Sequence, residues 1–376
     1  MLEYFNTDIT PLGLLLLMLF FVCVFALLRF YIKYYRAVGK YKSPTLSDTK
    51  HPVSVIVSCK NELEYVKQHL PFWLEQKYPH FEIVAVCDEN DEEILHIVRS
   101  FEQRYRNFKI VKISSGINFF DEEKFALSIG AKEASFEHLL FTTVESRPAS
   151  EYCIDYIQSA FTDKTTVVLG YPSFAITGAN IFSHFLYVDN TIRSLAMAIK
   201  GFPVVGQHRL LGYKKDYFFK TGGYTNTYSI KTGVYDYLHS EIKSDEIAVQ
   251  IDSHSIVKVV ENLNYNIWQK EEKKYFAALS CTNGKPKKEE ISYRIFLLLT
   301  YIIALLFLAS VELEWNSIQI LAFIVLALTK YVTQLAVMAT AMKRLAEKSI
   351  WIFIPLFELL YLPNTIISFF RIKRRK

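Results

Sequence analysis

Two kinds of sequence alternate along the chain: uncharged apolar stretches near both ends, and a mixed polar and apolar region between them. Residues 11–28 carry no charge and are rich in Leu, Phe and Val, and residues 295–311 are also uncharged. A helix needs roughly 20 apolar residues to cross the hydrocarbon core of a bilayer. These stretches therefore predict membrane spans, and any water-soluble domain has to be built from the residues between them.

The first apolar stretch has two interpretations, a cleaved signal peptide or a permanent anchor. A secretory signal has a basic start and a small-residue cleavage site. Here the acidic residues Glu3 and Asp8 precede the stretch, and the basic residues Arg29 and Lys33 follow it. We therefore interpret residues 11–31 as an uncleaved transmembrane anchor, and the basic flank predicts that the following residues lie in the cytoplasm.

The basic residues are unevenly distributed, although the formal net charge is only +5. They cluster directly after the first apolar stretch and at the extreme C-terminus. Because both clusters adjoin apolar stretches, they favour contact with a membrane surface over binding of nucleic acid. The five cysteines include no Cys-x-x-Cys pair, which argues against a zinc site or a disulfide framework and predicts reduced thiols.

Residues 51–285 have the pattern of a soluble α/β domain. The β-branched run at residues 53–57 is followed by apolar residues at helical spacing, and further strand-like runs occur at residues 81–86 and 108–113 and after a helical pattern, from Leu139. Strands that alternate with helices at this spacing predict parallel βαβ units with right-handed crossovers.

Polar side chains follow two of these predicted strands. Asp88 comes after the second strand, and the cluster Thr143-Val144-Glu145 comes after the strand that begins near Leu139. Because ligands of open α/β sheets bind at the carboxyl ends of the strands, we expect Asp88 and Glu145 to lie at one functional edge. The alternative for Asp88 is an ordinary turn or a helix N-cap.

The C-terminal third is again apolar. Two further transmembrane helices are predicted within residues 295–342, and Lys330 in the second should face other helices or extend to the membrane surface. Residues 349–370 are apolar but contain Pro355 and Pro363 and are bounded by basic residues at both ends. This pattern predicts a re-entrant or interfacial hairpin that is broken at Pro363.

Several of these segments carry a family resemblance. They are residues 53–62 (VSVIVSCKNE), 74–79 (LEQKYP), 124–127 (KFAL), 221–224 (TGGY) and 355–358 (PLFE). Together the chain resembles the family 2 glycosyltransferases, in particular their bacterial membrane-anchored branch. The resemblance implies a GT-A type fold, with a Rossmann-like mixed sheet in a cytoplasmic domain between N-terminal and C-terminal transmembrane helices. It also implies a location in the cytoplasmic (inner) membrane.

The resemblance further implies a donor, an acceptor and roles for particular residues. The donor is a nucleotide-diphosphate sugar, the acceptor is a glycan or a lipid-linked sugar, and transfer inverts the anomeric centre. Asp88 is expected to contact the nucleoside, Glu145 to bind Mg²⁺ or Mn²⁺, and Asp236 to act as the general base. The remaining expected donor-site residues are Lys60, Glu62, Lys124, Trp268 and Lys274.

The sequence departs from the family pattern at several of these positions. Thr143 stands where the first of two metal-binding acids is expected, and Val234 stands in the acidic cluster that normally supplies the base. Glu271 and Lys274 replace the Gln and Arg of the Gln-x-x-Arg-Trp-like element, although Trp268 is retained. A solvated amphipathic helix is the alternative interpretation of residues 268–275.

Three functional hypotheses follow. The first is an active glycosyltransferase that extends a cell-surface glycan or a lipid-linked sugar. The second is a catalytically inactive relative that serves as a binding or scaffold subunit of a polysaccharide pathway, together with other membrane subunits. The third is a membrane protein whose soluble domain has an unrelated function.

Overall fold

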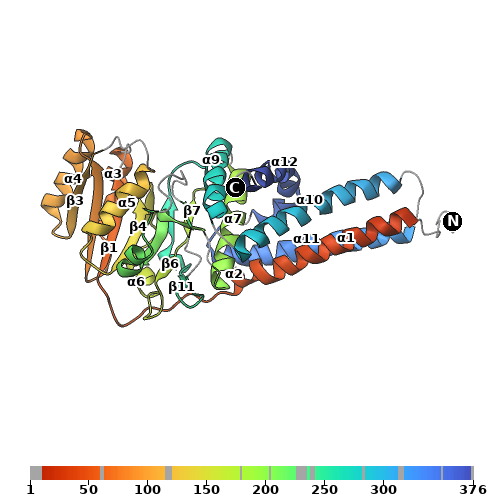
Figure 1. Cartoon of the computed structure of the whole chain (residues 1–376), viewed down its shortest axis with the longest axis horizontal. Helices are drawn as coiled ribbons and strands as arrows, with labels where there is room; N and C mark the ends of the chain where they lie inside the picture. The colour runs from red at the N-terminus through yellow and green to blue at the C-terminus, as the bar shows by residue number, and fades with distance from the viewer. Residues whose placement is uncertain are drawn as a thin grey trace.

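The computed structural model describes residues 11–59, 63–114, 121–177, 180–202, 205–225, 235–237, 242–281, 284–311, 317–348 and 350–373. A sheet domain flanked by helices forms one end of the elongated molecule, and a bundle of long helices extends from it toward the N-terminus (Figure 1). The helices α2 (Arg36–Lys40), α7 (Ile181–Ile199) and α9 (Tyr265–Cys281) lie between these two parts.

The first half of the sheet domain alternates strands and helices, as the sequence predicts. The strands are β1 (Val53–Cys59), β2 (Phe81–Asp88), β3 (Phe108–Ile113) and β4 (His138–Thr143), and the helices are α3 (Leu63–Leu74), α4 (Glu92–Arg104) and α5 (Glu122–Glu133). The four strands are parallel, with β1 between β4 and β2. Both faces of β1 are covered, which explains its continuous rather than alternating apolar sequence.

The second half of the domain makes the sheet a mixed one. Strand β9 (Leu211–Lys214) runs antiparallel between β4 and β6 (Val167–Leu169), and β11 (Ile247–Val249) pairs in parallel with β6 at the edge. The resulting seven-stranded sheet has the order β11-β6-β9-β4-β1-β2-β3. The predicted mixed α/β fold is thus confirmed.

Two small sheets and several short helices complete the domain. Strands β5 (Ser146–Pro148), β12 (Val257–Val259) and β7 (Pro172–Phe174) form one small sheet, and β10 (Tyr235–Tyr237) and β8 (Val205–Gln207) form the other. The short helices are α6 (Cys153–Gln158), the 3₁₀ turn η2 (His208–Leu210) and α8 (Lys215–Lys220). Because β5 begins three residues after β4 ends, this small sheet lies next to the carboxyl edge of the large one.

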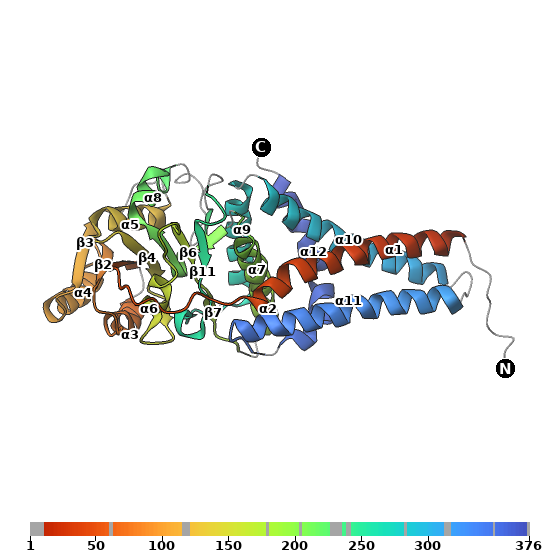
Figure 2. The ribbon, with the colours of Figure 1, turned by 90° about the horizontal axis from the view of Figure 1, so that it is seen from below.

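The helical bundle consists of α1 (Pro11–Phe30), α10 (Lys285–Val311) and α11 (Ser317–Arg344), which lie alongside one another in both views (Figures 1 and 2). Among the residues that the structure describes, three helices are long and apolar enough to cross a membrane, namely Pro11–Lys40, Lys285–Ser310 and Ser317–Arg344. They occur where the sequence predicts apolar spans. Many of their Leu, Ile and Phe side chains are exposed, as expected for surfaces that face lipid.

One buried ion pair lies among these apolar helices. Lys330 of α11 has its Nζ atom 2.5 Å from Oε2 of Glu358, and the two side chains are almost completely buried. Tyr301 of α10 donates a 2.7 Å hydrogen bond to the same carboxylate. The prediction that Lys330 faces neighbouring helices is confirmed by this pair. The pairing is expected, because an unpaired charge among apolar side chains is costly.

The last helix, α12 (Ile354–Lys373), differs from the predicted hairpin because it continues through Pro363. A proline inside a helix costs about 3 kcal/mol or more, since it removes a hydrogen bond and crowds the preceding turn. Contacts on the preceding turns offset this cost. Glu358 binds Lys330, and the Tyr361 hydroxyl accepts a 2.6 Å hydrogen bond from Nη1 of Arg294.

Candidate functional site

The loop after β4 is held rigidly at the carboxyl edge of the sheet. A ring nitrogen of His69 lies 2.7 Å from the Val144 carbonyl, and the Trp73 indole donates a 3.0 Å hydrogen bond to the Ser146 carbonyl. Both aromatic side chains come from α3, which packs against this loop. The backbone position of Glu145 is therefore fixed by buried contacts on both sides.

Thr143 and Glu145 have different environments within this loop. The Thr143 hydroxyl is buried and lies 3.0 Å from the Ser146 hydroxyl, with which it shares a hydrogen bond. Oε2 of Glu145 is buried and has no hydrogen-bond partner among the described residues. A buried carboxylate oxygen without a donor is costly, so Glu145 is the better candidate for contact with a ligand.

Asp88 lies at the same edge, at the end of β2 and across β1 from β4. Its Oδ1 atom accepts a 2.9 Å hydrogen bond from the backbone of Asn90. The N-cap of α4 is Asp91, whose carboxylate accepts from the Ile94 backbone at 3.0 Å. Of the two alternatives for Asp88, the structure thus supports the turn residue and not the helix cap, while its position remains compatible with a ligand at the edge.

Arg209 is a buried cation near Glu145 that the sequence does not indicate. Its carbonyl accepts a 3.1 Å hydrogen bond from the Thr142 hydroxyl, which fixes Arg209 beside the end of β4. Its guanidinium is buried, donates to Glu271 at 3.0 Å and lies 3.8 Å from Glu261. Burial acts to lower the pKa of Arg209, but nearby carboxylates, Glu271 foremost and Glu145 among them, outweigh burial and raise it.

Helix α9 supplies the closest carboxylate partner of Arg209, Glu271. Glu271 accepts hydrogen bonds from Arg209 and, at 3.1 Å, from Lys274 of the same helix. Burial alone would raise the pKa of Glu271, but the charges of Arg209 and Lys274 hold it below its ordinary value. Trp268 and Tyr275 of α9 are buried as well. The interpretation of residues 268–275 as a solvated amphipathic helix therefore holds for one face only, because Lys270 and Lys273 are exposed while Trp268, Glu271 and Tyr275 are buried.

Asp236 belongs to a neighbouring buried group. Its Oδ2 atom accepts a 2.6 Å hydrogen bond from the Tyr213 hydroxyl and lies 3.9 Å from Nε2 of His208. The Tyr224 hydroxyl is 2.9 Å from the same His208 nitrogen. Tyr224 follows Gly222 and Gly223, whose φ angles of 80° and 53° lie in the left-handed region that glycine adopts readily. The TGGY turn thereby delivers a tyrosine to the site.

Lys124 and Glu123, at the start of α5, extend this group toward Glu145. Burial lowers the pKa of Lys124, and the charge of Asp236 is the largest opposing influence. Burial raises the pKa of Glu123 to about 7, and the charge of Glu145 contributes in the same direction. The structure thus brings together the predicted residues Lys124, Asp236 and Glu145, and it adds Glu123 and His208, which the sequence did not indicate.

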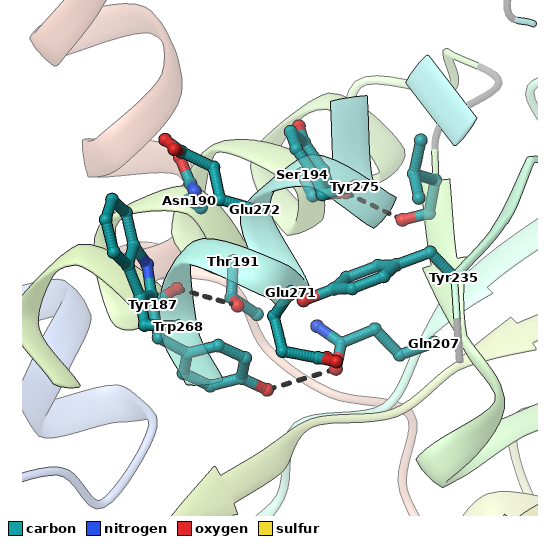
Figure 3. Close-up of a pocket in the computed structure, with 11 residues that line it drawn as sticks. Tyr187, Asn190, Thr191, Ser194, Gln207, Tyr235, Trp268, Glu271, Glu272 and Tyr275 are labelled. Atoms are coloured by element: carbon teal, nitrogen blue, oxygen red, sulfur yellow. Dashed lines mark hydrogen bonds between the residues drawn. The ribbon is translucent and has the colours of Figure 1, made fainter. Parts of the chain in front are cut away.

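A small cavity of about 20 Å³ lies between α7, α9, β8 and β10 (Figure 3). It is lined mainly by aromatic and hydrogen-bonding side chains. The lining residues are Tyr187, Asn190, Thr191, Ser194, Val205, Gln207, Tyr235, Trp268, Glu271, Glu272 and Tyr275. Because successive side chains of a strand point to opposite faces, Tyr235 faces the cavity while Asp236 faces Tyr213 and the sheet. Glu271 borders the cavity and also binds Arg209.

The residues near Glu145 do not match the paired acids that bind Mg²⁺ or Mn²⁺ in the resembling family. Divalent cations of this kind require several oxygen ligands, preferably carboxylates. Thr143 offers a hydroxyl that is already bonded to Ser146, and the cationic Arg209 is within electrostatic range of Glu145. Within the described part of the chain, no three His, Cys, Asp or Glu side chains are grouped closely enough to hold a metal. The donor set therefore does not fit the predicted metal.

The other predicted site residues divide as follows. Trp268 and Lys274 lie on α9 beside Glu271, at the Arg209 end of the site. Lys60 and Glu62, and also Val234, lie outside the described residues. The one signal for Arg209 in the sequence is a lone Arg within the segment GQHRLLGY, whose partners are 52 and 62 residues away along the chain, at Glu261 and Glu271.

The seven-stranded mixed sheet, with acidic side chains at its carboxyl edge, defines the chain as a GT-A type α/β protein with attached apolar helices. Residues 54–168 match the sequence model of Glycosyl transferase family 2. The matched residues run from β1 into β6 and include Asp88, Lys124 and Glu145. This match confirms, over residues 54–168, the predicted resemblance to the family 2 glycosyltransferases.

Solved structures include similar folds. The mannosyltransferase PcManGT from Pyrobaculum calidifontis, in complex with GDP-Man and Mn²⁺, is 14% identical with a TM-score of 0.56, and the match covers 94% of this chain and 99% of that one. At this identity the likeness concerns the fold. S. aureus TarS (residues 1–349) gives TM-scores of 0.38 alone and 0.41 with UDP-GlcNAc, at 13% and 11% identity, over 85% of this chain and 89% of that one. No curated protein matches the sequence significantly.

Proposed function

We propose that this chain is a membrane-anchored, inverting glycosyltransferase. Its donor is a nucleotide-diphosphate sugar, and its acceptor is a hydroxyl group of a glycan or of a lipid-linked sugar. The family match and the GT-A type sheet support the donor class. The apolar helices support an acceptor that is presented at a membrane surface.

In this proposal, residues 51–285 form the transferase domain on the cytoplasmic side of the inner membrane. The basic residues after α1, such as Arg36 and Lys40, and those near the end of α11, such as Lys343 and Arg344, support this orientation because positive residues favour the cytoplasmic side. Residues 11–31 and two helices within residues 295–342 span the membrane, and residues 349–370 lie at the membrane surface. The helix α12 runs across the bundle close to the sheet domain, which agrees with an interfacial position (Figure 2).

The proposed chemistry is a single displacement at the anomeric carbon. Asp236 removes the proton of the acceptor hydroxyl as that oxygen attacks, and the bond from the anomeric carbon to the diphosphate breaks with its electron pair on the diphosphate. Asp88 contacts the nucleoside, and Glu145 contacts the donor at the adjacent strand end. Trp268 and Lys274 act near the diphosphate, and Lys60, Glu62 and Lys124 are further residues that bind the donor.

The observation that carries this proposal is the position of the buried Asp236 beside the aromatic side chains that line the small cavity. Strand β10 separates the two, with Tyr235 on the cavity side and Asp236 on the sheet side. Aromatic rings with neighbouring hydrogen-bonding groups suit a sugar, which has both apolar faces and hydroxyl groups. The cavity itself has room for about one water molecule, so its lining side chains would have to move apart for an acceptor hydroxyl to reach Asp236.

The test is a transfer assay with the full-length protein in lipid nanodiscs and a panel of nucleotide sugars, with and without divalent cations. We expect release of the nucleoside diphosphate with at least one donor, and a loss of at least about 100-fold in the Asp236→Asn variant, in line with the usual contribution of a general base. Asp163→Asn, an exposed carboxylate on a loop, is the matched control.

Two results would contradict the proposal. Full activity of Asp236→Asn would remove the base assignment. Tight binding of a nucleotide sugar without any turnover, across donors and acceptors, would instead favour a non-catalytic binding subunit. The observation that favours this second function is the hydrogen bond from the Tyr213 hydroxyl to Asp236, because it already engages the carboxylate of the proposed base.

A further inference from the structure

A fixed organic cation, Arg209, lies near the strand end at which a metal is predicted. Arg209 is held beside the end of β4 by the hydrogen bond from Thr142 to its carbonyl, and its guanidinium is packed 5.1 Å from the centre of the Phe174 ring. Nε of Arg209 is buried without a hydrogen-bond partner among the described residues. Oε2 of Glu145, within electrostatic range, is in the same condition. An unused donor and an unused acceptor thus occur at the functional edge, on two side chains that interact electrostatically.

The two carboxylate partners of Arg209 are not equivalent. Glu271 is buried, lies 3.0 Å away and is held in turn by Lys274. Glu261 lies 3.8 Å away, and 34% of its side chain is exposed. A distance of 3.8 Å exceeds a normal hydrogen bond, so Glu261 is a weak and replaceable counter-ion. Because Glu261 is the more exposed of the two partners, an anionic ligand from solvent would approach the guanidinium on the side of Glu261.

We infer that Arg209 takes the place of a divalent cation and binds the diphosphate of the donor, and that Glu261 occupies the phosphate position until the nucleotide enters. This inference rests on the proposed function, because it assumes a nucleoside-diphosphate ligand. An arginine suits this role, since its planar guanidinium can donate two parallel hydrogen bonds to phosphate oxygens and remains charged at any physiological pH. Glu271 keeps the guanidinium in place, and Glu145 accepts a hydrogen bond from a sugar hydroxyl.

If Arg209 binds the diphosphate, donor binding does not require a metal. Exchange of Glu261 for phosphate leaves the charge of Arg209 compensated, whereas a divalent cation would meet the positive guanidinium at short range. Removal of Glu261 should therefore improve binding, because the phosphate no longer competes with an internal carboxylate. Removal of Arg209 should weaken binding whether or not a metal is added.

The experiment is calorimetric binding of UDP and GDP to the full-length protein in nanodiscs, in EDTA and in Mn²⁺. We expect affinities in the two conditions to agree within about threefold for the wild type. The double variant Arg209→Gln with Glu271→Gln removes both members of the buried pair, which avoids an isolated buried charge, and should lose about 10- to 100-fold in affinity. Glu261→Gln should gain about 3- to 10-fold.

Arg99→Gln, which alters an exposed arginine on α4, is the control and should leave the affinity unchanged. Binding that needs Mn²⁺ and survives in the Arg209→Gln, Glu271→Gln variant would overturn the inference and leave the proposed function intact. If neither nucleotide binds in either condition, the proposed function fails, and the inference fails with it. Weaker binding in Glu261→Gln would also overturn the inference, because Glu261 would then be a ligand-binding group and not a competitor.

Discussion

The Nη1 atom of Arg209 donates a 3.0 Å hydrogen bond to Oε2 of Glu271, and this contact links the carboxyl edge of the central sheet to helix α9. Both side chains are almost completely buried. In the sequence, Glu271 was notable as a departure from the glutamine of related enzymes. In the structure, Glu271 balances the charge of Arg209, which is not among the site residues that the sequence predicts.

Loss of Glu271 should therefore destabilise the sheet domain. Glu271→Ala leaves Arg209 buried without its closest carboxylate, so we expect the free energy of unfolding to fall by about 3–5 kcal/mol. Arg209→Met combined with Glu271→Leu should recover most of this loss, because apolar replacements of a buried pair are often nearly neutral. Denaturant titration in detergent measures both. A loss below about 1 kcal/mol in Glu271→Ala would contradict the buried pair.

A second stability prediction concerns the apolar helices. Glu358→Ala removes the partner of Lys330 and should lower the free energy of unfolding by about 3–5 kcal/mol, since it leaves a buried ammonium group. Glu289→Ala provides the comparison, because Glu289 pairs with Lys33 at 3.0 Å at a site where both side chains are partly exposed. That pair should contribute about 0–1 kcal/mol. In matched detergent, the thermal unfolding midpoint of Glu358→Ala should therefore be well below that of Glu289→Ala. Equal midpoints would argue against the buried pair.

The raised pKa of Glu123 predicts a pH dependence of stability. Its pKa is about 7 in the folded protein, against 4.5 for the ordinary group. The folded state therefore keeps its proton longer than the unfolded state does. Stability from this group is present below about pH 4.5 and is lost as the pH rises to about 7.

Glu123→Gln removes this titration and should flatten the dependence of the denaturation midpoint on pH between about 4.5 and 7. Glu122→Gln, at the exposed neighbouring position, should keep the wild-type slope. Measurements at several pH values in one buffer series are sufficient. An unchanged slope in Glu123→Gln would show that Glu123 ionises normally.

Substitutions should be able to introduce a metal requirement for the binding of nucleoside diphosphates. In the Arg209→Gln, Glu271→Gln background, Thr143→Asp restores two carboxylates at the spacing Asp-x-Glu, and oxygen ligands of this kind bind Mg²⁺ and Mn²⁺. We expect this triple variant to bind nucleoside diphosphates at least about tenfold more tightly in Mn²⁺ than in EDTA. Thr143→Asn in the same background has similar size without the charge and should show no Mn²⁺ effect. An equal response of the two would count against the role assigned to this position.

The sheet could be predicted from sequence because its strands are local and strongly patterned. Residues 53–57 form an unbroken β-branched run, and β1 indeed has both faces covered. The same locality placed Asp88 and Glu145 at strand ends. Strand β9 was not predicted as an antiparallel insertion, since its four residues contain Gly212 and have no strong strand pattern.

The parts that the sequence did not predict depend on partners far along the chain. Helix α9 was open to interpretation as solvated because its charges are dense, yet Arg209 and Tyr361 supply buried partners for Glu271 and Glu272. The break expected at Pro363 failed for a similar reason, because contacts of Glu358 and Tyr361 hold the helix. Such pairings are invisible in local periodicity, so Arg209 was missed as well.

The most direct test is an experimental structure of the full-length protein with the nucleoside diphosphate that binds it best, prepared in EDTA. We expect the diphosphate within hydrogen-bond distance of the Arg209 guanidinium, with Glu261 displaced, the nucleoside toward Asp88, and the terminal phosphate near Glu145. A diphosphate bound elsewhere, or bound at Glu145 only through an added metal with Arg209 still paired to Glu261, would contradict this expectation.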